Sequence, residues 1–291
     1  MFMLRYFSPR IRTVLSGISD IKKYNEIRLR TDAPVILRGV FRDELITSCL
    51  CSQDDIEYSF RAVCDDSVHS YARELREGFI TIPGGHRVGL CGTAVNNQRG
   101  IKTIKNISGM NFRIARQVTG CSDDIYKQLC SDGPRSILVS GAPLSGKTTI
   151  LRDLCRNLAH DYRVSVIDER SEIAAVYNGE PQNDVGAKSD IFDGYCKRSG
   201  IETAIRVMSP EVIVCDEIGS YDDVKALSAS MNSGVKIVAS VHAGSPQELL
   251  TRKRIMKLVK SGIFEYIVFL EHGCRTSSIV YWKDFIKKIT V

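Results

Sequence analysis

The sequence contains no apolar run long enough to cross a bilayer. Stretches such as Ile263–Leu270, which Glu265 interrupts, are far shorter than the roughly 20 residues that a membrane helix needs. The opening segment, MFMLRYFSPRIR, also lacks the apolar core and the small-residue cleavage site of a secretory signal. From these two absences we expect a protein that stays in the cytosol.

Metal-ligand spacing and strong charge bias are absent as well. The ten cysteines, Cys49, Cys51, Cys64 and Cys91 among them, show no paired ligand spacing, so we interpret them as reduced, buried small side chains. The net charge of +6 divides into +4 over residues 1–132 (19 basic against 15 acidic) and +2 over the remainder (21 against 19). Neither half therefore predicts a basic nucleic-acid-binding domain.

One octapeptide carries most of the functional information: Gly141–Thr148 reads GAPLSGKT, the pattern of a phosphate-binding loop. Its glycines let backbone N–H groups curve around phosphate oxygens, while Lys147 reaches the β- and γ-phosphates and the Thr148 hydroxyl ligates Mg²⁺. The predicted nucleotide-binding residues are Gly141, Ala142, Pro143, Leu144, Ser145, Gly146, Lys147, Thr148 and Thr149.

The surroundings of the octapeptide fit a phosphate loop. Ser136–Ser140 is a short apolar run of strand type, and TTILRDLCRNLA after the lysine has apolar residues at helical spacing. The order strand, loop, helix places the amino end of a helix against the phosphates.

A second carboxylate element follows the loop by roughly seventy residues, at VIVCDE (Val212–Glu217). Four apolar residues predict a strand buried on both faces that delivers two acids at its carboxyl end. Asp216 would hold Mg²⁺ through water, and Glu217 would polarise the attacking water. In the alternative interpretation Asp216 caps a helix and Glu217 is solvated. Both acids together favour an ATPase that uses ATP and Mg²⁺.

Residues 133–291 alternate strand-like and helical segments, as an α/β domain does. The predicted strands are Arg163–Ile167, Val212–Cys215, Val235–Val241, Ile263–Leu270 and Ser277–Trp282, and the predicted helices are Ile201–Met208, Tyr221–Asn232 and Pro246–Val259. Right-handed, short connections require a mostly parallel sheet with its site at the carboxyl ends of the strands.

Residues 1–132 predict a smaller α+β domain. Glu26–Leu37 holds two β-like runs around a turn, Ser52–Gly78 is helical in pattern, and Phe79–Val95 reads as a strand, a Gly-Gly turn and another strand. We place the boundary at Ser131–Pro134 (SDGP), because a glycine-proline pair favours a turn or linker.

Six segments in this order resemble one family: GFITIPGGHRVGL, NFRIAR, the phosphate loop with TTILRDL, DERSEIA, RVMSPEVIVCDEIG and SVHAGS. Together they resemble the stage III sporulation protein AA family, which is similar to the hexameric ATPases of type II and type IV secretion and pilus motors. The resemblance runs from about Glu26 to Leu270. It departs at Leu144, where many such loops carry another glycine, and at Gly186–Gly194, where an arginine is expected near Lys188.

The resemblance gives candidate roles to three residues of the second domain. Asp168 and Glu169 follow the strand-like RVSVI, like the acidic box of secretion ATPases, which implies that they align water or Mg²⁺ at the γ-phosphate. A helix cap leading into SEIAAVY explains this pair equally well. His242 ends the run KIVASV; the resemblance implies that it senses the γ-phosphate, whereas a lone histidine at a strand end indicates a structural role.

Arg113 and Arg116 lie in NFRIAR, where Phe112 and Ile114 alternate with Arg113 as in a strand with one buried and one wet side. Spacing alone favours a solvated basic edge. The resemblance instead implies that these arginines reach a γ-phosphate in a neighbouring subunit. An arginine supplied by a neighbouring subunit raises the turnover rate by roughly 10³- to 10⁵-fold, so hydrolysis would then depend on assembly.

The leading hypothesis combines these features with the resemblance. It is a P-loop NTPase of the RecA/AAA-like secretion type that forms a ring, expected to be a hexamer, and drives a membrane-embedded channel needed for endospore development. The resemblance places it in the mother cell, recruited to membrane proteins of that channel complex, with no nucleic acid expected.

Two other hypotheses remain open. A nucleic-acid-dependent RecA-like motor would use the basic cluster Arg252, Lys253, Arg254, Lys257 and Lys260, although a solvated helix face explains this cluster equally well. A nucleotide-dependent switch would bind ATP and barely hydrolyse it. The presence of Glu217, a candidate base for the attacking water, argues against this hypothesis.

Overall fold

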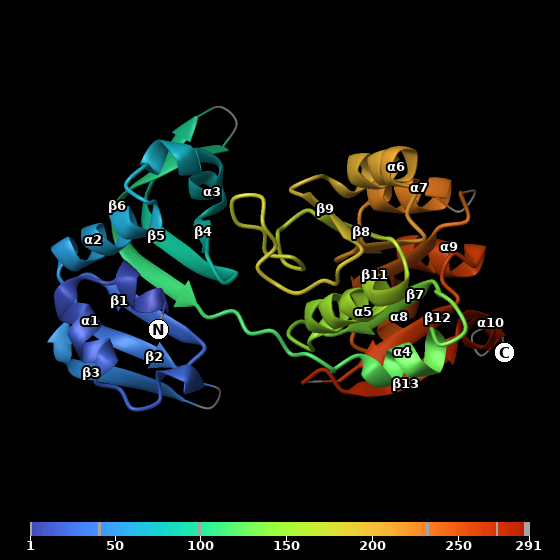
Figure 1. Cartoon of the computed structure of the whole chain (residues 1–291), viewed down its shortest axis with the longest axis horizontal. Helices are drawn as coiled ribbons and strands as arrows, with labels where there is room; N and C mark the ends of the chain where they lie inside the picture. Colours follow the sequence, from blue (N-terminus) through green and yellow to red (C-terminus); the bar gives the residue numbers. More distant parts are fainter. Residues whose placement is uncertain (1, 40–41, 98–99, 231–232, 272, 288–291) are drawn as a thin grey trace. The chain divides into compact units, whose positions relative to one another are not determined.

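The computed structural model describes residues 2–39, 42–97, 100–230, 233–271 and 273–287 (Figure 1). The chain forms two compact units, Met1–Arg116 and Gln117–Val291, so the division falls earlier than the predicted boundary at residues 131–134. The reason is a short helix, α4 (Asp123–Leu129), whose Ile125 and Leu129 are buried in the core of the second unit. Residues 117–132 therefore belong with the phosphate loop.

Unit 1 is built on a six-stranded antiparallel sheet in the order β3-β2-β1-β6-β5-β4. Its elements, with η for 3-10 helices, are η1 (Phe2–Tyr6), α1 (Pro9–Ser16), η2 (Ile21–Lys23), β1 (Glu26–Arg30), β2 (Pro34–Arg38), β3 (Asp43–Leu50), α2 (Gln53–Val63), η3 (Val68–Tyr71), α3 (Ala72–Glu77), β4 (Phe79–Ile82), β5 (His86–Asn97) and β6 (Gly100–Arg113).

Alternation along the strands builds the core of unit 1. In β1, Ile27 and Leu29 are buried while Glu26, Arg28 and Arg30 are not, so one side of the sheet packs inward. Phe7, which follows η1, packs against Phe112 of β6 in this core, with ring centroids 4.5 Å apart. The predicted hairpin is present, because β4 and β5 are joined through Gly84 and its neighbouring glycine, both at positive φ.

The helical segment predicted over Ser52–Gly78 is interrupted. Helix α2 ends at Val63, and the following Asp65 and Asp66 have φ of 44° and 56°, in the left-handed region that a helix cannot continue through. The segment resumes as η3 and α3.

Unit 2 is built on a seven-stranded sheet in the order β13-β12-β7-β11-β10-β8-β9, and every pair is parallel except β12 with β13. After α4 its elements are β7 (Ile137–Gly141), α5 (Lys147–Asp161), β8 (Val164–Asp168), β9 (Ser189–Asp193), α6 (Lys197–Met208), β10 (Val212–Cys215), α7 (Tyr221–Ser230), β11 (Lys236–His242), α8 (Pro246–Thr251), α9 (Lys253–Ser261), β12 (Tyr266–Leu270), β13 (Thr276–Tyr281) and α10 (Trp282–Lys287).

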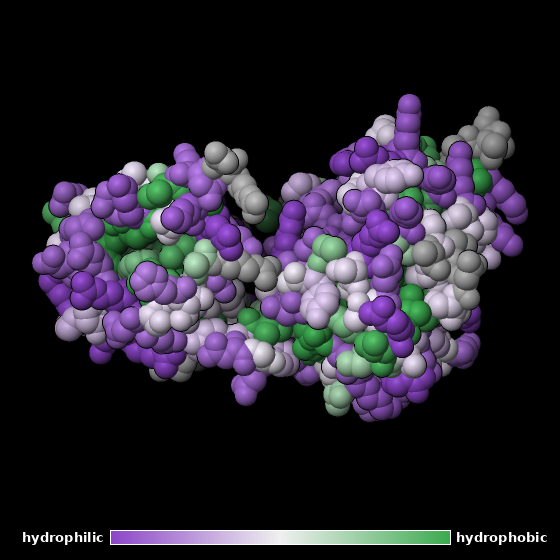
Figure 2. Space-filling model, turned by 90° about the horizontal axis from the view of Figure 1, so that it is seen from above, coloured by the Kyte–Doolittle hydropathy of each residue, from purple (hydrophilic) through white to green (hydrophobic). Residues whose placement is uncertain are grey.

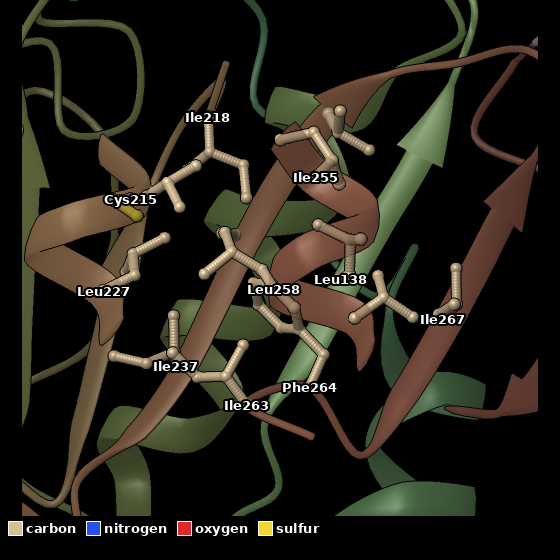
Figure 3. Close-up of a cluster of buried hydrophobic side chains, with 14 of the residues drawn as sticks. Leu138, Cys215, Ile218, Leu227, Ile237, Ile255, Leu258, Ile263, Phe264 and Ile267 are labelled. Carbon is tan, nitrogen blue, oxygen red and sulfur yellow. The ribbon is translucent and has the colours of Figure 1, made fainter. Parts of the chain in front are cut away.

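Both faces of the unit 2 sheet are covered, which explains its continuously apolar strands. Along β7, Leu138 packs into one cluster, whereas Ile137 and Val139 pack into another. The first cluster lies under helices α6, α7, α9 and α10, and the second under α4 and α5. Figure 3 shows the first cluster, in which Ile218 and Ile255 pack beside the strands.

Three elements of unit 2 differ from those predicted. The strand β9 was not predicted, and the predicted helix Pro246–Val259 is two helices, because Arg252 has φ −80° and ψ 73° between them. Helix α7 ends at Ser230, and the last two residues of the predicted helix lie outside the described residues.

The prediction that the cysteines are buried holds for only part of them. Six are buried, namely Cys49, Cys51, Cys64, Cys130, Cys155 and Cys215. Cys91 in β5 and Cys196, just before α6, are exposed, and Cys121 and Cys274 are half-buried.

On the face that Figure 2 shows, hydrophilic residues interrupt the hydrophobic areas of both units. Among the described residues, no helix combines the length and the apolar character required to traverse a lipid bilayer.

Asp55 ties together three segments of unit 1. Its carboxylate accepts hydrogen bonds from Ser8 Oγ (2.5 Å) and from the backbone N–H of Ser52 (2.8 Å), and it pairs with Arg10. Burial by itself would raise the pKa of this carboxyl group. The hydrogen bonds from Arg10, Ser8 and Ser52 outweigh burial and lower the pKa of Asp55 to about 2.

We predict that Asp55→Asn destabilises unit 1 by about 2 kcal/mol near neutral pH, the free energy that corresponds to this pKa shift. Because the folded-state pKa is depressed, the contribution is present above about pH 4 and is lost as the pH falls toward 2. Urea unfolding followed by far-UV circular dichroism at several pH values measures the difference.

Two controls make this test specific. The single tryptophan, Trp282, lies in unit 2, so its fluorescence transition should not move. Asp54→Asn changes an exposed carboxylate in the same helix turn and should have little effect. A difference between wild type and Asp55→Asn that persists unchanged at pH 2 would contradict the assignment.

Candidate functional site

The order of the strands assembles the site. The four neighbouring parallel strands β7, β11, β10 and β8 end side by side at one edge of the sheet. Gly141 ends β7, His242 ends β11, Asp216 follows β10 and Asp168 ends β8. Residues separated by about a hundred positions in the sequence thus meet at the carboxyl ends of the strands, where α/β sheets bind ligands.

The phosphate loop leads directly into helix α5. Gly146 precedes the helix with φ 98°, and a Cβ added there would lie 2.3 Å from Cys274 Sγ, so only glycine fits. Leu144 also has a positive φ, 63°, and its side chain is 90% exposed, so the departure from glycine is accommodated by pointing the side chain into solvent. Pro143 is exposed beside it.

Lys147 is folded onto its own loop. Its Nζ donates hydrogen bonds to the carbonyl oxygens of Gly141 (3.0 Å) and Ala142 (2.8 Å). Burial lowers the pKa of Lys147, while the negative charges of Asp216 and Glu217 act in the opposite direction. The Ser145 hydroxyl is buried and has no hydrogen-bond partner within the described parts of the chain. An ammonium group and an unpaired hydroxyl at the amino end of a helix suit a phosphate group.

Oxygen ligands for a divalent cation lie beside this loop. Thr148 Oγ1 donates a hydrogen bond of 2.7 Å to Asp216 Oδ2. The other carboxylate oxygen, Oδ1, accepts hydrogen bonds from Ser240 Oγ and from the backbone N–H of Glu217 (2.8 Å). Thr149 follows in the first turn of α5. A hydroxyl and a carboxylate are the ligand types that Mg²⁺ prefers, so this pair fits Mg²⁺.

Glu217 projects from the same strand end toward other partners. Its backbone has φ 42° and its N–H donates to Ser240 Oγ at 2.9 Å. Its Oε1 lies 3.2 Å from His242 Nε2 and its Oε2 lies 3.1 Å from Arg170 Nη1. All three side chains line a cleft of about 650 Å³. The carboxylate is therefore held at both oxygens and remains accessible to water.

Asp168 organises a loop. It is 2% exposed, and its carboxylate accepts hydrogen bonds from the backbone N–H groups of Glu172 (2.8 Å), Ile173 (3.0 Å) and Ala174 (2.8 Å). Burial nevertheless raises the pKa of this carboxyl group. The helix that the alternative interpretation placed after Asp168 is absent, because residues 170–176 form turns, bends and irregular backbone around the carboxylate.

Glu169 points in another direction. Its Oε2 accepts a 2.6 Å hydrogen bond from Lys197 Nζ at the start of α6. Burial acts to lower the pKa of Lys197, but the bond to Glu169 and the negative charges of Asp223 and Glu169 together outweigh burial and raise the pKa. Lys188, near which the family resemblance led us to expect an arginine, donates to the Asp161 carbonyl oxygen at 3.0 Å.

Arg113 and Arg116 lie in unit 1, whereas every residue of the site above lies in unit 2. The strand alternation predicted around Arg113 is present, because Phe112 is buried and the Arg113 side chain is 62% exposed. Arg113 Nε lies 3.6 Å from Glu26 Oε1, and Arg116 Nη2 donates to the Tyr24 carbonyl oxygen at 3.0 Å.

Three residues of the site were not predicted from the sequence: Ser240, Arg170 and Lys197. Ser240 had a recognisable signal, since it is a hydroxyl in the buried strand KIVASVH two positions before His242, and so on the same side of the strand. Arg170 and Lys197 had none, because their partners Glu217 and Glu169 are far away in the sequence.

A glycine loop between a parallel strand and a helix, with an acid pair two strands away, defines unit 2 as a P-loop NTPase fold. The fold is that of secretion ATPases. The ATPase DotB of Legionella pneumophila superposes with a TM-score of 0.59 at 15% identity, covering 96% of this chain and 82% of that one. The pilus retraction motor PilT with bound ADP gives a TM-score of 0.63 at 14% identity, covering 94% and 82%.

Sequence comparison identifies the family. The profile described as "Sporulation stage III, protein AA" matches residues 2–283, and the chain belongs to that family, as predicted. Stage III sporulation protein AA of Bacillus subtilis (strain 168) is 34% identical over 286 residues, 94% of this chain and 92% of that protein. Protein SEEDLING PLASTID DEVELOPMENT 1 of Arabidopsis thaliana is 30% identical over 264 residues, 88% of this chain and 35% of that protein.

We predict that Gly146→Ala lowers the free energy of unfolding of unit 2 by about 3 kcal/mol. Roughly 1 kcal/mol comes from a left-handed non-glycine residue and the rest from the contact with Cys274. The transition of Trp282 fluorescence in urea measures the change.

Gly179→Ala is the matched control, since Gly179 also has a positive φ (84°) but has no atom within 4 Å of an added Cβ. It should cost only about 1 kcal/mol. If the contact is responsible, Gly146→Ala combined with Cys274→Ala loses less stability than the two single variants together. Strict additivity would show that the contact with Cys274 is not the cause.

Proposed function

We propose that the protein is a Mg²⁺-dependent ATPase that hydrolyses ATP to ADP and phosphate. The observation that carries this proposal is the 2.7 Å hydrogen bond between Thr148 and Asp216, which joins the phosphate loop to the acidic strand end. A hydroxyl and a carboxylate in this arrangement offer a cation site beside the phosphate-binding helix terminus. The accessible Glu217 next to them supplies the base that a passive nucleotide binder does not need.

The residues divide the work of one hydrolytic step. Lys147 leaves the carbonyl oxygens of its loop and pairs with the phosphates, and Mg²⁺ when bound neutralises charge on their oxygens. Water attacks the γ-phosphorus, the bond from that phosphorus to the bridging oxygen breaks, and Glu217 receives the proton of the water. Ser240 orients Asp216 through a hydrogen bond. His242 contacts one oxygen of Glu217 and senses the γ-phosphate through this carboxylate.

Family membership supports the wider setting of the proposal. The protein acts in the cytoplasm of the mother cell during endospore development, as a ring expected to contain six copies, at a channel complex whose membrane proteins it contacts. Asp168 and Glu169 support the γ-phosphate side of the site by fixing the loop that follows β8. Arg113 and Arg116 complete the site from a neighbouring copy.

We predict that Lys147→Ala lowers ATP hydrolysis by about 100-fold or more and abolishes nucleotide binding, because the ammonium group is the main positive charge in the loop. Glu217→Gln should keep ATP binding while losing turnover. Phosphate release and calorimetric titration with ATP and Mg²⁺ measure the two properties.

Lys127→Ala, which removes an exposed lysine of α4, is the control and should behave as wild type. Added DNA or RNA should leave the rate unchanged, whereas a salt-sensitive stimulation would support the nucleic-acid motor instead. Wild-type turnover in the Lys147→Ala protein would refute the proposal.

We also predict complementation between two inactive variants. Arg113→Ala keeps an intact phosphate loop, and Lys147→Ala keeps its arginines. In an equimolar mixture about one quarter of the interfaces pair an intact loop with an intact arginine from the neighbouring copy, so about one quarter of the wild-type rate should return. Arg116→Ala tested in parallel distinguishes the two arginines. Arginines that act within their own copy would give no recovery.

A further inference from the structure

Arg170 holds a position that the proposed reaction does not yet explain. It follows the acidic pair at the end of β8, and its Nη1 lies 3.1 Å from Glu217 Oε2. The two side chains are 66% and 40% exposed, and both line the cleft of about 650 Å³. A guanidinium group therefore rests on the carboxylate that is proposed to accept a proton.

The backbone that carries Arg170 is fixed relative to the phosphate loop. Asp168 accepts three backbone N–H bonds from the segment just after Arg170. Arg152, from helix α5, donates to the carbonyl oxygens of Ile173 (2.8 Å) and Glu172 (2.7 Å) in the same segment. Because α5 begins at the phosphate loop, these bonds tie the Arg170 segment to the helix that receives the phosphates.

The contact with Glu217 can be exchanged. An ion pair between two side chains this exposed contributes little stability, whereas arginine binds phosphate oxygens through two parallel, charge-assisted hydrogen bonds. Two other cations of the cleft have carboxylate partners away from Glu217: Lys197 bonds to Glu169 at 2.6 Å, and Arg252 lies 3.3 Å from Glu248.

We propose that Arg170 is a catalytic residue that changes partner: it rests on Glu217 before nucleotide binds and moves to the γ-phosphate of bound ATP. This exchange leaves Glu217 Oε2 open for the proton of the attacking water, while His242 keeps Oε1 in place. The inference rests on the proposed function. It adds a catalytic arginine from the same copy to the arginines proposed to come from a neighbouring copy.

Nucleotide binding tests the exchange without any turnover. Calorimetric titrations of wild type and Arg170→Ala use a non-hydrolysable ATP analogue and, separately, ADP, each with Mg²⁺. Because the proposed partner is the γ-phosphate, Arg170→Ala should weaken binding of the analogue by about 10-fold and change binding of ADP by less than about twofold. Equal losses for both nucleotides, or no loss for the analogue, would overturn the proposal.

Turnover provides the second measurement. Arg170→Ala should lower the rate at saturating ATP by about 100-fold, and Arg170→Lys should restore part of it, since lysine keeps the charge but loses the paired geometry. An Arg170→Ala rate equal to or above that of wild type would mean that the residue only restrains Glu217, and would overturn the proposal.

Arg198→Ala is the matched control, because Arg198 forms a similar exposed pair with Glu202 (3.2 Å) on helix α6, away from the cleft. It should change neither nucleotide affinity nor rate. Trp282 fluorescence in urea verifies that each variant is folded. If wild type neither binds nor hydrolyses ATP, the proposed function itself fails. If wild type does both and Arg170→Ala does them equally well, only the role of Arg170 fails.

Discussion

The hydrogen bond between Thr148 and Asp216 is the interaction on which the arrangement of the site depends. It joins the first turn of α5, which follows β7, to the end of β10, and β11 lies between these two strands. The bond can form only if the parallel register brings the ends of those strands level, and that register is fixed by apolar side chains on both faces. Ser240 then links the intervening strand to the same carboxylate, so three neighbouring strand ends share one hydrogen-bonded group.

Each charged side chain around this group has a polar or oppositely charged partner. Lys147 is held by carbonyl oxygens of its own loop, Glu217 lies between Arg170 and His242, and Glu169 is bonded to Lys197. A triphosphate can replace the carbonyl partners of Lys147, because phosphate oxygens are stronger acceptors for cations than a backbone carbonyl group is. The chain alone therefore keeps its charged side chains satisfied while leaving them oriented toward one edge of the sheet.

The sequence was sufficient to predict the parts of the site that depend on local pattern. The glycine loop, the helix after it and the acid pair after an apolar strand each follow from a few consecutive residues, and the parallel sheet follows from their alternation. The roles of Arg170 and Lys197 could not be predicted, because only the fold brings each side chain close to its carboxylate partner. The boundary after residue 132 was misplaced for the same reason: α4 looks like an independent segment, and only its packing against α5 assigns it to unit 2.

The two arginines of unit 1 are not equally suited to leave their present partners. Arg113 contacts Glu26 at 3.6 Å, but that carboxylate is already bonded to Arg28 at 2.6 Å and to the Asn111 amide at 3.2 Å. Glu26 therefore remains satisfied when Arg113 departs, and the pair with a side chain that is 62% exposed contributes little. Arg116, by contrast, donates to the Tyr24 carbonyl oxygen, and its departure removes a hydrogen bond from the segment just before β1. If one arginine of this unit engages a phosphate in a neighbouring copy, the energetic cost of recruitment favours Arg113.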